Sequence, residues 1–177
     1  VVQIPIESKS FGRIATQNAK NLILQKIREE ERKVVYDQYF EKEKDIVTGI
    51  VQRYVGKNIS INLGKADAML TENEQVKGEV FKPTERIKLY VVEVKNTTKG
   101  PKILVSRTHA ELVKRLFGAE VTEVKGGTVE IKSIARAAGS RTKIAVWSND
   151  PDVDPVGACV GMNGARVNAI VEELRGE

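Results

Sequence analysis

Two glycines separated by two residues, Gly161 and Gly164, form the spacing in this sequence that most clearly suggests binding chemistry. Apolar residues lie on both sides of the pair in VGACVGMNGARVNAIVEEL, which predicts a short helix ending at Gly161 and a second helix from about Gly164 to Arg175. The first amides of a helix are unpaired and lie at the positive end of its dipole, and glycine leaves room for a phosphate to approach them. The pattern is therefore typical of a loop that holds a nucleic-acid backbone. A plain helix–turn–helix hairpin is the alternative, because 14 glycines in 177 residues produce such a spacing by chance about once.

The cations around this loop are candidate ligands for a phosphate backbone. Arg166 stands in the first turn of the second helix and is the strongest candidate, with a solvated helix charge as the alternative. Lys132, Arg136, Arg141 and Lys143 flank the predicted strands and are expected either to line a groove or to lie on a solvated edge. The candidate RNA contacts of this region are Gly161, Met162, Asn163, Gly164, Ala165, Arg166, Lys132, Arg141 and Lys143.

The sequence gives no support for catalysis or for a bound metal or cofactor. One cysteine, Cys159, and one histidine, His109, make a zinc site and a Ser-His-Asp triad improbable. Neither a GxxxxGK[ST] loop nor a GxGxxG motif occurs. Asp150, Asp152 and Asp154 lack the glycine and glutamate of a calcium loop, which favours turn and cap roles. Cys159 lies in an apolar run and is expected to be a buried, inert thiol. We therefore predict no catalytic residue, no cofactor and no metal.

Composition and charge indicate a globular chain with a polyanionic partner. The chain is 41% hydrophobic and 30% charged, and no apolar run approaches the roughly 20 residues of a membrane span. The absence of a signal peptide pattern and the single cysteine favour the cytoplasm. The net charge is +5, and residues 45–110 hold eleven Lys and Arg against seven Asp and Glu. Because the sequence begins at Val1 instead of methionine, we expect it to be a fragment.

Residues 10–44 are expected to form one long helix, with Ser10 as its N-cap. Apolar residues at spacings of three and four make a stripe on its first half, namely Phe11, Ile14, Ala15, Ala19, Leu22, Ile23 and Ile27. The stretch REEERK that follows is charged on every side. Such a helix either docks at one end and spans space at the other, or is an ordinary packed helix followed by a solvated arm.

Residues 45–108 are expected to form a small closed β-barrel of five or six short strands. The candidate strands, separated by turn residues, are Ile46–Tyr54, Asn58–Leu63, Ala66–Leu70, Gln75–Lys82, Lys88–Glu93 and Lys102–Arg107. Four cations of this segment, each of which could equally be solvated, are candidates for contacting an RNA backbone: Arg53, Lys57, Lys102 and Arg107.

Residues 109–177 mix helices and strands. AELVKRLFG predicts a short helix that stops at Gly118, with His109 as a candidate cap. GTVEIKSIAR and KIAVWS alternate as half-buried strands around the turn AAGSR, and Trp147 on the second strand is expected in the core. Asp154 as N-cap and Pro155 at the first helical position start the helix before the two glycines.

The stretch from GTVEIKSIARAAGSR to the end of the chain closely resembles the first KH domain of the bacterial NusA family of transcription elongation, termination and antitermination factors. The order of elements is similar to that of a type II KH domain, and the barrel from Asp45 to Arg107 looks like the S1-type OB fold that precedes KH domains in this family. GRIATQNAKNLILQKIREEER and VYDQYF are similar to the end of the family's N-terminal domain and its linker helix.

This resemblance implies a multidomain α+β protein made of a long N-terminal helix, an S1-type five-stranded barrel and a type II KH domain with a GxxG loop. The implied domains are 1–44, 45–108 and 109–177, the last without its final strand. The resemblance implies a non-catalytic factor in the cytoplasm, expected to be a monomer without a membrane contact. Its implied partners are single-stranded RNA, RNA polymerase and other transcription elongation factors, and its implied role is to modulate pausing, termination and antitermination.

A further departure from the family pattern, besides the missing final strand, qualifies these expectations. Lys57 and Ser60 stand where many S1 domains place aromatic residues that stack on bases, so this barrel is expected to bind RNA by charge or to act as a spacer. Tyr54, Phe81 and Tyr90 are possible substitutes, with core packing favoured for the last two. The alternative function is a protein-interaction or spacer fragment that docks on polymerase and binds little RNA itself, and a third is the accessory half of an RNA-processing enzyme.

Overall fold

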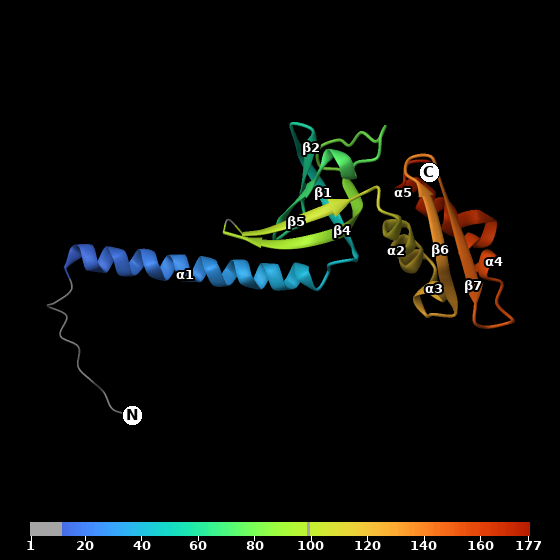
Figure 1. Cartoon of the computed structure of the whole chain (residues 1–177), viewed down its shortest axis with the longest axis horizontal. Coiled ribbons are helices and arrows are strands. Elements are labelled where there is room, and N and C mark those ends of the chain that lie inside the picture. Colours follow the sequence, from blue (N-terminus) through green and yellow to red (C-terminus); the bar gives the residue numbers. More distant parts are fainter. Residues whose placement is uncertain (1–11, 99) are drawn as a thin grey trace, which may run out of the picture.

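The computed structural model describes residues 12–98 and 100–177. Its elements form a long helix, a closed β-barrel and a mixed helix–strand unit, arranged in that order along the molecule (Figure 1). This is the predicted α+β fold class with a five-stranded barrel, which is therefore confirmed. Among the described residues, no helix combines the length and the apolar character needed to cross a membrane.

Helix α1 (Arg13–Phe40) is 28 residues long and extends from the barrel as a rod (Figure 1). Its last turns contact the barrel, where Val35 and Tyr36 pack on the core and the buried Tyr39 donates its hydroxyl to the carbonyl of Leu63 at 2.8 Å. The apolar stripe of the first half is exposed, with Ile14 and Leu22 as examples. The helix thus contacts the barrel at its C-terminal end and projects at the other. The predicted N-cap, Ser10, and the stripe residue Phe11 lie outside the described residues.

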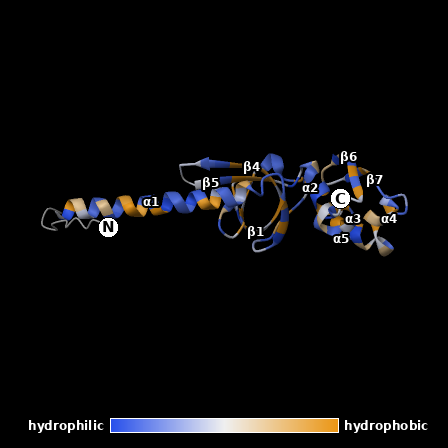
Figure 2. Cartoon of the chain, turned by 90° about the horizontal axis from the view of Figure 1, so that it is seen from below, coloured by the Kyte–Doolittle hydropathy of each residue, from blue (hydrophilic) through white to orange (hydrophobic). Residues whose placement is uncertain are grey.

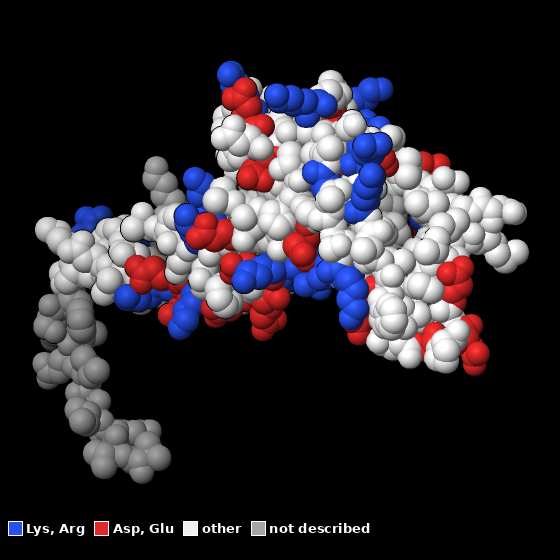
Figure 3. All heavy atoms as spheres, turned by 45° about the vertical axis from the view of Figure 1, so that its right-hand side comes forward, with Lys and Arg blue, Asp and Glu red and all other residues white. Residues whose placement is uncertain are grey.

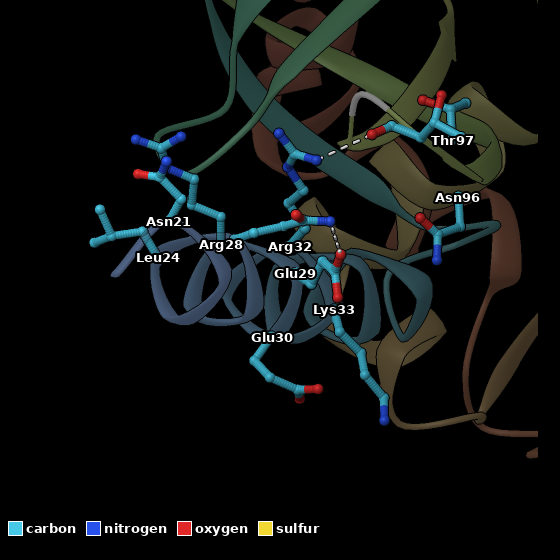
Figure 4. A pocket seen from close by; sticks show the side chains of 11 residues that line it. Asn21, Leu24, Arg28, Glu29, Glu30, Arg32, Lys33, Asn96 and Thr97 are labelled. Atoms are coloured by element: carbon cyan, nitrogen blue, oxygen red, sulfur yellow. Dashed lines mark hydrogen bonds between the residues drawn. The ribbon is translucent and has the colours of Figure 1, made fainter. Parts of the chain in front are cut away.

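A cleft of about 890 Å³ separates α1 from the turn between the fourth and fifth strands (Figure 4). Arg32 crosses it and donates to the carbonyl of Thr98 at 3.0 Å. Arg28 and Lys33 line the cleft together with Glu29 and Glu30, so its charges are of both signs. This mixed lining suits a contact that braces the helix against the hairpin better than it suits an anion site.

The barrel consists of β1 (Ile46–Val55), β2 (Asn58–Asn62), β3 (Asp67–Leu70), β4 (Arg86–Thr97) and β5 (Gly100–Ser106). Its strand order is β1-β2-β3-β5-β4, and β3 and β5 are parallel while the other neighbours are antiparallel. The alternating Val, Ile and Leu residues of each strand fill the interior, as the period of two requires.

The predicted strand Gln75–Lys82 is wrong. A short 3-10 helix, η2 (Glu72–Glu74), leads into an irregular segment whose Phe81 packs in the barrel core. Val76 and Phe81 are buried there, and in the sequence such apolar residues resemble those of a buried strand. Gly78, however, has a φ of +95°, which breaks the extended backbone of a strand. The side-chain amide of Gln75 donates to the backbone carbonyl of Leu70 in β3 and to that of Lys57 in the turn after β1, and the segment pairs with no strand.

The C-terminal unit has two layers, with helices on one side of a two-stranded antiparallel sheet. Its elements are α2 (Ala110–Glu120), α3 (Thr122–Lys125), β6 (Val129–Ala137), β7 (Arg141–Ser148), α4 (Pro155–Val160), η3 (Met162–Gly164) and α5 (Ala165–Glu173). Figure 2 shows β6 and β7 on one side of this unit and α3 and α5 on the other. The layers enclose an apolar core that includes Cys159, whose predicted burial is confirmed.

Local cap chemistry follows the sequence at two helix starts and departs from it at one helix end. The side chain of His109 accepts from the amide of Glu111 at 3.2 Å, and Asp154 accepts from two amides ahead of Pro155, which confirms both predicted caps. The predicted stop at Gly118 is wrong, because α2 continues to Glu120. The two additional residues bring Val121, which is fully buried, into the core, and this burial outweighs the cost of a glycine inside a helix.

Glu177 is held in a buried cluster at the tip of the β6–β7 hairpin. Arg136 donates two hydrogen bonds to its carboxylate, at 2.7 and 2.8 Å, and the amide of Gly139 and the hydroxyl of Thr142 donate as well. Burial alone raises the pKa of Glu177, but the hydrogen bonds from Arg136, Thr142 and Gly139 outweigh it and hold the pKa at about 2, against an ordinary value of 4.5. The carboxylate therefore stabilises the fold only while it is ionised.

Replacing Glu177 with glutamine is expected to destabilise the chain at neutral pH and to matter less in acid. Because the folded pKa is depressed, the stability that Glu177 contributes is complete above about pH 4.5 and is lost as pH falls towards 2. Urea unfolding of the wild type and of E177Q at several pH values measures the difference between them. That difference should shrink by up to about 1.4 kcal/mol per pH unit below pH 4.5, and a difference that stays constant from pH 6 to about pH 3 would contradict this assignment.

Candidate nucleic-acid interface

The backbone of the turn between α4 and α5 explains its two glycines. Gly161 has φ 74° and ψ 175°, a combination that residues with a Cβ essentially never adopt. A Cβ on Gly161 would also come within 2.8 Å of the Cγ of Arg166. Gly164 is left-handed, with φ 78° and ψ 11°, which favours glycine. The turn itself thus requires Gly161 and favours Gly164, and their presence does not by itself indicate a ligand.

The two residues between the glycines form an exposed tip. Met162 is 87% exposed and Asn163 is also exposed. Asn163 is left-handed at φ 50°, which asparagine tolerates better than most residues. Among the described residues, no carbonyl accepts from the amide of Met162 or of Asn163. Two neighbouring free N–H groups on an exposed turn are able to receive a phosphate oxygen.

Arg166 faces inward, beneath this tip. Its Nη1 donates to the Glu123 carboxylate at 2.8 Å and to the carbonyl of Ala158 at 2.7 Å, and its stem lies against Gly161. The side chain is 32% exposed. The pKa of Glu123 is lowered by its own backbone amide and by Thr122, with Arg166 contributing further. In this conformation Arg166 braces the turn from below, and its role as a phosphate ligand stays a prediction.

An apolar groove of about 310 Å³ lies beside the turn, between β7 and the helices α4 and α5. Five of the apolar residues that line it come from α4 and α5: Val156, Val160, Val167, Ile170 and Val171. Ile144 and Val146 of β7 face them, and Arg141 stands at the rim. The groove and the exposed turn are continuous through Val160, which lines the groove and directly precedes Gly161.

The structure does not bring all the predicted cations of this unit to the groove. Lys143 is exposed on β7 at the same side of the strand as Trp147, while Thr142, Ile144 and Val146, which alternate with them, line the groove. Lys132 lies at a bulge of β6 and forms an ion pair with Glu130. Lys132 and Lys143 therefore belong to the other face of the sheet.

The barrel cations are dispersed. Arg53 and Lys57 lie at the end of β1, and Lys57 forms an ion pair with Glu72 at 3.1 Å. Lys102 stands opposite Lys95 near the far end of β4, and Lys95 lies nine residues, or about 30 Å of strand, beyond Arg86. On the face in Figure 3, Lys and Arg side chains alternate with Asp and Glu instead of forming one continuous patch. Arg53, Lys57 and Lys102 cannot all contact one short RNA segment.

Arg107 is a correction to the predicted set, because its side chain is 0% exposed and cannot reach RNA. Its five N–H donors are all used. Nε and Nη2 donate to the Glu79 carboxylate, Nη1 donates to the carbonyl of Lys88 at 3.0 Å and to Glu173 Oε1 at 3.1 Å, and Nη2 also donates to the carbonyl of Glu173 at 2.9 Å. Arg107 joins the barrel to α5 and is part of the interface between the two units.

Trp147 is the second correction. It was expected in the core, but it is 59% exposed on β7. The alternation along β7 is the cause, because Thr142, Ile144 and Val146 face the helices and place Lys143, Ala145 and Trp147 on the opposite face. The alternation in KIAVWS contained this information, since a strand with Ile144 and Val146 inward must have Trp147 outward. Phe81 and Tyr90 are buried as expected, and Tyr54 is half exposed on the barrel.

Comparison with known protein families matches two regions of the chain. Residues 107–177 match the NusA-like first KH domain, and residues 1–33 match the NusA N-terminal domain. The first match covers the sheet, the GxxG turn and the helices on both sides of it, so the two-layer unit is a KH domain.

Curated relatives match the chain over nearly its whole length. The transcription termination/antitermination protein NusA of Bacillus subtilis is 56% identical over 177 residues, which is 100% of this chain and 48% of the relative. The proteins of the same name from Halalkalibacterium halodurans and Thermus thermophilus are 52% and 41% identical, over 100% and 98% of this chain and 46% and 45% of the relatives. This chain spans about half the length of the curated relatives that it matches. With two NusA family models on its two ends and these identities throughout, the chain belongs to the NusA family.

Proposed function

We propose that this chain binds single-stranded RNA and acts as part of a factor that modulates transcription termination and antitermination. The exposed tip of the GxxG turn carries the proposal, because it presents two free amides beside an apolar groove, within a KH domain. The names of the relatives support the transcriptional role. The proposed RNA contacts are the turn from Gly161 to Arg166 and Arg141 at the rim, with Arg53, Lys57 and Lys102 as separate contacts on the barrel.

The proposed assignment divides the chain into three parts. Residues 1–44 are the end of an N-terminal domain with its linker helix, residues 45–108 an S1-type OB domain, and residues 109–177 a KH domain. We assign RNA polymerase and other transcription elongation factors as protein partners, a cytoplasmic location, a monomeric state and no catalytic role. The exposed stripe of α1, with Ile14, Leu22, Ile23 and Ile27, is the surface best suited to a protein contact.

Binding of a single-stranded RNA oligonucleotide is expected to weaken as salt is added. For single strands, log K falls with log salt by about 0.7 for each phosphate neutralised, so three phosphate contacts lower the affinity about twentyfold between about 50 and 200 mM salt. Fluorescence anisotropy of a labelled oligonucleotide measures this slope, and a duplex of the same length is the control. An affinity that does not change with salt concentration, or an equal affinity for the duplex, would contradict the proposed function.

A further inference from the structure

The KH domain has a second exposed surface, the face of the β6–β7 sheet turned away from the helices. On β7, Ile144 and Val146 join the core while Lys143, Ala145 and Trp147 are exposed on the other side of the strand. Opposite these three on β6 stand Ala135, Ser133 and Glu130 in the antiparallel register, and Lys132 lies exposed at the bulge of β6, paired with Glu130. We call these seven residues the outer sheet face. In Figure 2 the strands form one side of the domain, and no labelled helix of the domain lies beyond them.

Trp147 is the unusual member of this face. It is the chain's one tryptophan, and it is 59% exposed although burying an aromatic side chain is normally favourable. On this side of β7 the residue between Trp147 and Lys143 is Ala145, and it is paired with Ser133; both are too small to cover an indole ring. An exposed tryptophan above a floor of small side chains presents an uncovered aromatic surface, and aromatic surfaces of this kind stack on unpaired bases.

The charges on the same face suit a phosphate backbone. Lys143 precedes Trp147 by four residues on the same side of β7, so the two residues are about 13 Å apart along the strand. Within the described residues Lys143 takes part in no ion pair, whereas the one acidic residue of the face, Glu130, is paired with Lys132. The lowered pKa of Glu130 has that hydrogen bond from Lys132 as its largest cause.

We propose that the outer sheet face is a second contact surface for single-stranded RNA, on which Trp147 stacks against a base while Lys143 contacts a phosphate. The choice of RNA as the ligand rests on the proposed function, but the surface is separate from the GxxG turn, which lies on the helix side of the sheet. Positive charge next to an aromatic platform is the arrangement by which proteins bind single strands without reading their sequence.

The single tryptophan makes the proposal directly measurable, because its fluorescence reports on this face and on no other part of the chain. Titration of the complete chain with an unlabelled poly-U oligonucleotide is expected to quench the emission of Trp147. Labelled oligonucleotide is expected to bind W147A between about fivefold and about a hundredfold more weakly than the wild type, the loss typical of one stacked base. W147F should bind more tightly than W147A, since it keeps an aromatic ring. K143A should lower the affinity for RNA without changing the thermal unfolding.

The outcomes separate this proposal from the function of the GxxG turn. Unchanged emission together with wild-type affinity of W147A would overturn the proposal that the outer sheet face binds RNA, even if substitutions in the turn abolish binding. The face would then be available to a protein partner. Quenching and a weakened W147A, with binding unaffected by substitutions in the turn, would support this face and contradict the turn. Because Trp147 is exposed, circular dichroism of W147A should match the wild type, and this match shows that the comparison is between folded chains.

Discussion

Replacing Arg107 with alanine is expected to lower the free energy of unfolding by about 3 to 5 kcal/mol. The guanidinium is fully buried, and all five of its N–H donors are satisfied by Glu79, Glu173 and the carbonyl of Lys88. Removing it leaves the carboxylate of Glu79, which is itself 5% exposed, buried without its partner cation. The penalty comes from this uncompensated charge, because breaking a buried pair costs far more than the pair contributes when intact.

Arg175 supplies a matched control for this substitution. Like Arg107 it lies over the ring of Phe81, at 4.9 Å against 5.5 Å, and it forms an ion pair across the same interface, with Glu85. Its side chain is 37% exposed, however, and exposed pairs contribute little. Urea unfolding followed by circular dichroism should give R175A a loss of about 1 kcal/mol or less. Equal losses for R107A and R175A would show that the buried network does not hold the barrel and the KH domain together.

Local sequence patterns were sufficient for most of the elements. The strands β1, β2, β3, β5, β6 and β7 coincide with apolar alternation bounded by turn residues, and β4 differs mainly in length. The caps at His109 and Asp154 follow from side-chain chemistry within three residues. The errors at Gln75–Lys82 and Gly118 have one origin. In both places the apolar residues are buried by tertiary contacts that override the local pattern, as Val76 and Val121 demonstrate.

The candidate site was harder to predict, because exposure of a charged side chain depends on residues far away in the sequence. Arg107 was an RNA candidate on its charge alone, but its partners Glu79 and Glu173 are 28 residues before it and 66 residues after it. No spacing rule connects those three positions. Trp147 differs, since the alternation of its own strand placed it opposite Ile144 and Val146, and only a general preference of tryptophan for the core suggested burial.

Introducing two aspartates at the tip of the GxxG turn, as M162D with N163D, is expected to weaken single-stranded RNA binding about tenfold or more. Each carboxylate places a negative charge next to the free amides proposed to receive a phosphate, and repulsion at about 4 Å amounts to about 1 to 4 kcal/mol near a protein surface. The fold should be unaffected, because Met162 is exposed and aspartate tolerates the left-handed backbone of position 163. Both glycines remain in place.

A matched pair of charges elsewhere separates a local effect from a change in net charge. Gln17 and Asn18 are exposed on α1, remote from the KH domain, so Q17E with N18D adds the same two charges without touching the turn. This control is expected to bind RNA within about twofold of the wild type, because charges beyond a Debye length of about 10 Å are largely screened. Equal thermal unfolding of the three proteins shows that any difference in affinity comes from binding.

The affinity of these three proteins for one single-stranded RNA oligonucleotide, measured at low and at moderate salt, tests the central claim most directly. The claim is that the exposed GxxG turn of this NusA-family chain contacts the RNA backbone. A loss confined to M162D with N163D, largest at low salt, is the predicted result. Wild-type affinity in that variant would contradict the claim: the turn would then only connect two helices, and RNA would bind elsewhere on the chain.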